Sequence, residues 1–224
     1  MSFKSRLLRS VVTLAFISTL SAGSALADII FTDYGSGFSY NTGVGVEVGV
    51  VPGLTTHFAP AFEFTSSGNF SVTEIVLSVG FISGTNGVLV SLHDDASGTP
   101  GAFLANVVLT GLSNFSPGGG STIGIFLIPP PDVILLSGNS YWLEVSPLGS
   151  DTHAAWMENS TGIFGTECNP SPSCFANQTL GAFEIDGTPI AVPGPIAGAG
   201  LPGLILASGG LLGWWRRRRR QLVA

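Results

Sequence analysis

The chain is short of positive charge, and the little that it has lies at its two ends. Only 8 of the 224 residues are lysine or arginine, and none of them lies between Arg9 and Arg216. All 14 acidic residues lie between Asp28 and Asp186. This central body has no surface for phosphate groups, which excludes nucleic acid as a partner.

Motifs of known catalytic and metal sites are missing as well. There is no Gly-x-Ser-x-Gly sequence for a nucleophile, and His57, His93 and His153 do not have the spacing of metal ligands. A glycosidase needs two carboxylates held across a cleft, and the sequence marks no such pair. We therefore expect a protein that is not an enzyme and that needs no cofactor.

The first 27 residues predict export. Three basic residues are followed by an apolar run over residues 11–20 and then by small residues that end at Ala25 and Ala27. This layout is typical of a secretory signal peptide, with cleavage expected between Ala27 and Asp28. A retained membrane helix is the alternative, but its apolar part would be short.

Cysteine is limited to two residues, Cys168 and Cys174, in the segment CNPSPSC. In an exported protein these thiols would meet an oxidising compartment, so we predict a local disulfide between them. Two cysteines with no further cysteine nearby make a metal site an unfavourable interpretation.

The body, residues 28–186, predicts an all-β fold. Apolar residues alternate with a period of two along residues 71–82, 87–95 and 140–145, and no stretch has a convincing helical period. Glycine-rich turns separate these runs, as in an antiparallel jelly-roll-like β-sandwich. Further strands are expected at residues 45–51, 61–65, 104–110, 121–127, 154–158 and 182–186.

The C-terminal segment predicts a single membrane-spanning helix over residues 196–215. It carries no charge and is long enough to cross one hydrocarbon core. Trp214 and Trp215 suit the membrane interface, and the basic tail 216–224 suits the cytoplasmic side under the positive-inside rule. The topology-determining residues are Arg216, Arg217, Arg218, Arg219 and Arg220.

This tail resembles the PEP-CTERM sorting signal of bacteria that make extracellular polysaccharide. The likeness consists of a short proline motif, an apolar helix and a terminal arginine cluster. In the linker 187–195 the motif is Val192, Pro193, Gly194 and Pro195, so that glycine takes the place of the family's glutamate. The resemblance implies an exosortase-type membrane protease as a partner, with the tail either cut off or kept as an anchor.

Residues 59–160 resemble the choice-of-anchor domains of bacterial surface proteins, most closely the type called R. The likeness is carried by AFEFTSSGNFSVTEIVLSV, VLVSLHDDASGTPGAFLAN, LSGNSYWLEV and AAWMENS, in this order. It implies an extracytoplasmic domain associated with the cell envelope and supplies no activity.

Two groups inside the body are candidate binding residues. Asp94 and Asp95 follow a strand in HDDASGTPG and are expected to cap a turn, with a calcium site as the alternative. Trp142 and Trp156 are expected in the packing of the sheets, but if exposed they would stack on sugar rings. The leading hypothesis is thus an exported, non-catalytic envelope protein, and the alternative is a carbohydrate-binding module for matrix polysaccharide.

Overall fold

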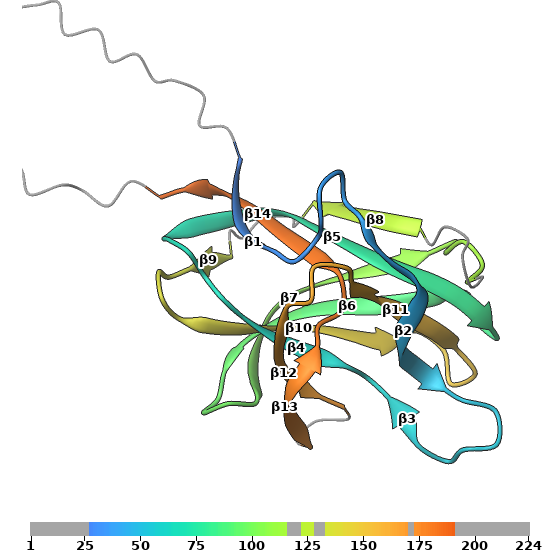
Figure 1. The fold of residues 1–224 in the computed structure, drawn as a ribbon. Helices are drawn as coiled ribbons and strands as arrows, with labels where there is room; N and C mark the ends of the chain where they lie inside the picture. The colour runs from blue at the N-terminus through green and yellow to red at the C-terminus, as the bar shows by residue number, and fades with distance from the viewer. Residues whose placement is uncertain (1–26, 116–121, 128–132, 170–172, 191–224) are drawn as a thin grey trace, which may run out of the picture.

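The structure is a computed structural model, and it describes residues 27–115, 122–127, 133–169 and 173–190. Every regular element in these residues is a β-strand (Figure 1). The strands are β1 (Asp28–Thr32), β2 (Tyr40–Val50), β3 (His57–Phe58), β4 (Ala61–Thr65), β5 (Phe70–Ser83), β6 (Gly87–Asp95), β7 (Pro100–Thr110), β8 (Thr122–Leu127), β9 (Ile134–Leu135), β10 (Ser140–Pro147), β11 (His153–Asn159), β12 (Phe164–Cys168), β13 (Cys174–Thr179) and β14 (Phe183–Pro189).

The strands form two antiparallel sheets. One sheet, called here the β5 sheet, has the order β1-β14-β5-β11-β2-β3, and β8 and β9 also pair with β5. The other, called the β10 sheet, has the order β13-β12-β4-β10-β6-β7. The prediction of an all-β protein built from antiparallel sheets is confirmed at this level, and the arrangement is consistent with a sandwich.

The period-two pattern of the sequence explains the core between the sheets. Ile75, Leu77 and Val79 of β5 are buried in one cluster with residues of the β10 sheet. The β10-sheet residues in this cluster that the alternation predicted are Val88, Val90, Leu92, Tyr141, Leu143 and Val145. Burial of this many apolar side chains is the main favourable contribution to folding.

Several strands lie where the sequence gave no strand signal. The short strands β3 and β9, the edge strand β1 and the hairpin of β12 and β13 were not expected. The hairpin and β1 lie at sheet edges, where many side chains face solvent and apolar alternation is weak. Strand β14 continues through Pro189, so residues 187–189 belong to the sheet and not to the linker.

The first and last strands of the body are neighbours. β1 pairs with β14 in antiparallel register, and Asp28 lies opposite Gly187 (Figure 1). The described chain therefore begins and ends at the same end of one sheet. This places the predicted signal cleavage point beside the start of the predicted linker.

Candidate functional site

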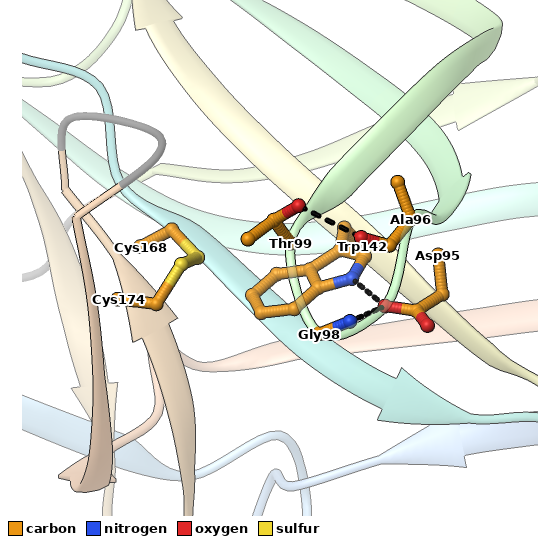
Figure 2. The surroundings of a disulfide bond; sticks show 7 residues. All are labelled: Asp95, Ala96, Gly98, Thr99, Trp142, Cys168 and Cys174. Atoms are coloured by element: carbon orange, nitrogen blue, oxygen red, sulfur yellow. Dashed lines mark hydrogen bonds between the residues drawn. A yellow bond between two sulfur atoms is a disulfide. The ribbon is translucent and has the colours of Figure 1, made fainter.

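Trp142 lies inside the protein and does not form a ligand platform. It points away from the main core, to the outer side of the β10 sheet, where it packs with Ala61 and Cys168. Figure 2 shows its indole between the disulfide on one side and the turn at residues 95–99 on the other. Its exposed fraction is 0%, so the sugar-stacking interpretation is wrong for this residue.

Trp156 is buried in the core between the two sheets. Its exposed fraction is also 0%, its ring lies edge-on to Phe62 at 4.7 Å between centroids, and its Nε1 donates to the Ala182 carbonyl at 3.1 Å. Two sheets enclose this side chain because β11 is central in the β5 sheet. The glycan-contact interpretation is therefore wrong for Trp156 too.

The two cysteines form the predicted disulfide. Cys168 and Cys174 lie directly opposite each other on β12 and β13, and their sulfur atoms are bonded. The bridge closes the hairpin at the edge of the β10 sheet and covers Trp142 (Figure 2). Its position favours a structural role for the bond.

Asp94 and Asp95 cap the β6–β7 turn. Asp95 Oδ1 accepts from the Gly98 backbone N–H at 3.0 Å and from Trp142 Nε1 at 2.9 Å, and Asp94 Oδ1 accepts from the Ala102 N–H. Both aspartates also line a polar hollow of about 440 Å³ next to residues 138–141. These hydrogen bonds support capping as the role of both aspartates. In the described part of the chain no three His, Cys, Asp or Glu side chains are placed to hold a metal ion.

The histidines have separate surroundings. His153 of β11 is buried, and its Nε2 lies 2.6 Å from Oε2 of Glu47 on the neighbouring strand β2. His93 lies opposite Trp142 on the outer side of the β10 sheet, where burial raises the pKa of Glu144 and the electrostatic interaction with His93 lowers it. His57 is exposed in β3. The structure does not bring these three residues together.

Several carboxylates lack any basic partner. Burial, with smaller contributions from Glu184 and Glu74 on the same sheet, raises the pKa of Asp186 to about 6. Burial also raises the pKa of Glu167, a hydrogen bond from Asn169 opposes this rise, and Glu158 adds to it. Because the body has no Lys or Arg, a ligand that approaches these surfaces meets uncompensated negative charge.

Two clefts flank the edge strand β1. The outer cleft, about 310 Å³, is lined by Ile29, Thr32, Tyr34, residues 35–38 and Glu184. The inner cleft, also about 310 Å³, is lined by Phe31, residues 63–65, residues 163–166 and Leu180. Sequence analysis missed both, because β1 and β12 were not expected to be strands.

The alternation of β1 explains why the clefts lie on opposite sides of it. Ile29 lies opposite Asp186, and Phe31 lies opposite Ile185, after a bulge at Ile30. Ile185 is a core residue, so Phe31 faces the space between the sheets while Ile29 faces the outside. Phe31 stacks on Phe183 at 4.8 Å between ring centroids, which gives the inner cleft an aromatic floor.

The remaining predicted residues lie at or beyond the ends of the described chain. Ala27 is exposed, and Asp28 starts β1. Outside the described residues lie Ala25, the motif Val192–Pro195, the predicted helix 196–215 and Arg216–Arg220. Within the described ranges there is no helix that is long and apolar enough to cross a membrane.

The comparison with known proteins does not assign the chain to a family. No protein-family model matches the sequence, and no curated protein does.

Proposed function

We propose that this chain is an exported, non-catalytic protein of the bacterial cell envelope, whose jelly-roll-like body is delivered by the signal peptide 1–27 and held or sorted by its C-terminal segment. The observation that carries the proposal is the pairing of the body's two ends. Asp28 lies opposite Gly187 in the β1–β14 ladder, so both membrane-directed segments of the precursor would join the body at one point.

This geometry suits a domain that is attached at a single end. An apolar segment at each terminus of the precursor could lie in the same membrane without stretching or opening the β-sheet. After the signal peptide is removed, the body would be joined to the membrane through residues 190–195 alone. The opposite end of the sandwich would then be free to face the envelope and its polysaccharide.

The disulfide of the body also suits an extracytoplasmic location. Disulfides persist in oxidising compartments, and the Cys168–Cys174 bond is part of the packing around Trp142. The carbohydrate-binding alternative relied on Trp142 and Trp156 as sugar contacts, and both side chains are buried. We therefore infer association with the envelope through the tail and not through a tryptophan platform.

The test is the intact mass of the protein recovered from the host's envelope. The proposal expects a chain that begins at Asp28, and a chain end near Pro195 would indicate cleavage by an exosortase-type protease. A chain end at Ala224 would indicate a permanent helical anchor. A cytoplasmic protein that still begins at Met1 would refute the proposal.

A pair of variants separates sorting from anchoring. Gly194→Glu restores the Pro-Glu-Pro pattern and should raise the cleaved fraction if an exosortase-type protease acts here. Replacing Arg216–Arg220 with glutamine should reduce the fraction with the expected topology under the positive-inside rule. Gly203→Glu, which adds the same charge inside the apolar run, is a control for the first variant.

A further inference from the structure

The edge of β1 is an unpaired strand with a cleft on each side. In the described chain, β1 pairs with β14 along one edge and no strand pairs with its other edge. The backbone groups on a free edge can pair with an extended segment of another chain. β1 also supplies side chains to both clefts, through Ile29 and Thr32 on one side and Phe31 on the other.

We propose that this edge binds an extended peptide segment of another protein as an added β-strand. In strand addition, main-chain hydrogen bonds supply affinity, and pockets for alternate side chains supply specificity. Successive side chains of an added strand point to opposite faces. They would therefore enter the inner and the outer cleft in turn.

Exposed apolar side chains gather around this edge. Ile29 is 54% exposed and Phe38 is 43% exposed on the outer side, while Phe164 is 62% exposed at the inner cleft. The inner cleft exists because β12 pairs with β4 only at Ala61 and Phe62, so that residues 63–65 and 163–166 lie on its two walls. An added strand with large apolar side chains on its inner face would cover Phe164 and the aromatic floor at Phe31.

Charge indicates the kind of peptide. Glu184 lines the outer cleft and Glu63 lines the inner one, and the body contains no lysine or arginine to balance them. A second copy of the body would bring 14 further acidic residues and no basic ones, which opposes self-association. The matching occupant is a peptide from a different protein, with apolar residues that alternate with basic ones.

The test uses a fluorescent seven-residue peptide, Lys-Leu-Lys-Leu-Lys-Leu-Lys, and the intact mature protein. Fluorescence anisotropy should show saturable binding. Two N-methylated forms of the peptide then provide a matched pair, one methylated on the leucine N–H groups and one on the lysine N–H groups. Because alternate N–H groups of a strand point to opposite edges, one form should bind at least tenfold more weakly than the other. The identity of the weaker form reports the direction of the added strand.

Protein variants locate the binding edge. Phe164→Ser should weaken binding about tenfold, since it removes a large apolar side chain from the inner cleft. Phe103→Ser is the control, because Phe103 has a similar exposed fraction of 55% but lies on β7, an edge strand of the other sheet, the β10 sheet. Melting temperatures of both variants equal to that of the wild type would show that neither variant disturbs the fold.

Three results would overturn the inference. Equal binding of the two methylated peptides would mean adsorption through charge and apolar contact without strand pairing. Equal weakening by Phe164→Ser and Phe103→Ser would place the peptide elsewhere. A peptide-free dimer that dissociates in the Phe164→Ser variant would make a second copy the occupant. All three readouts are independent of whether the C-terminal tail is cleaved.

Discussion

Asp33 is a buried carboxyl group whose replacement tests the electrostatics of the fold. Its side chain has an exposed fraction of 0%. Oδ1 accepts from the Phe183 backbone N–H at 2.7 Å, but the buried Oδ2 has no hydrogen-bond partner. Burial therefore raises the pKa of Asp33 from 3.8 to about 8, and the hydrogen bond from Phe183 offsets only part of the rise.

The raised pKa makes stability fall as the pH rises. Between the unfolded value of 3.8 and the folded value of about 8, the folded protein binds a proton at Asp33 that the unfolded chain has lost. Stability from this group is fully present below the lower pKa and decreases by about 1.4 kcal/mol per pH unit up to the higher one. From pH 5 to pH 7 the loss is about 3 kcal/mol.

Asp33→Asn removes this titration. The asparagine keeps an oxygen for the Phe183 N–H, and its added N–H₂ group, without an acceptor, costs roughly 1–3 kcal/mol at every pH. The free energy of unfolding of the variant, relative to the wild type, should therefore rise by about 3 kcal/mol between pH 5 and pH 7. Urea unfolding curves at pH 5, 6, 7 and 8, followed by tryptophan fluorescence, measure this difference.

The other buried acids do not confuse the comparison, because they titrate in both proteins and cancel in the difference. Asp28→Asn, a change at the exposed start of β1, is the control and should give a curve parallel to that of the wild type. If the free energies of unfolding of Asp33→Asn and the wild type differ by a constant amount from pH 5 to pH 8, the assignment of a buried, protonated Asp33 is wrong.

The remaining predictions concern packing, the disulfide and a glycine in strand β2. Trp142→Ala should cost about 3–5 kcal/mol of unfolding free energy, and Trp142→Phe about 1–2 kcal/mol through loss of the Nε1 bond to Asp95; a change near zero in urea unfolding would refute the buried position. The double variant Cys168→Ser and Cys174→Ser should lose about 2 kcal/mol of unfolding free energy, and reduction of the wild type should cause the same loss. An unchanged urea midpoint after reduction would contradict a stabilising bond. Gly49→Ala should lower the free energy of unfolding by more than about 2 kcal/mol, because Gly49 has φ +90° and an added Cβ would overlap the Thr152 carbonyl. Gly53 has the same φ but open space around it, so the control Gly53→Ala should lower it by only about 1 kcal/mol. Equal melting temperatures of the two variants would refute the clash.

The central strands could be predicted from the sequence because their burial follows local alternation. Strands β4 and β6 have the predicted bounds, and the predicted inward faces of β5, β6 and β10 lie in the common core. Alternation indicates a strand wherever one face packs on a core and the other does not. At the edges this contrast is weak, so β1, β12 and β13 gave no signal.

The disulfide was predictable because the two cysteines are the only ones in the chain and lie close together in sequence. The surroundings of Trp142 were not, because its neighbours come from three distant segments: β4, the turn after β6 and the β12–β13 hairpin. An outward-facing tryptophan on a strand looks the same in sequence whether solvent or a hairpin covers it.

The sequence by itself determined the all-β class, the antiparallel strands of the core, the acidic body without a basic residue and the pairing of its two cysteines. These properties depend on composition, on short-range alternation and on neighbouring residues. Only the tertiary structure decided that Trp142 and Trp156 are buried, that Asp33 is enclosed, that the body begins and ends on adjacent strands and that β1 has a cleft on each side. Each of these depends on which distant segments meet, and strand pairing and sheet packing set those contacts over separations that no local pattern records.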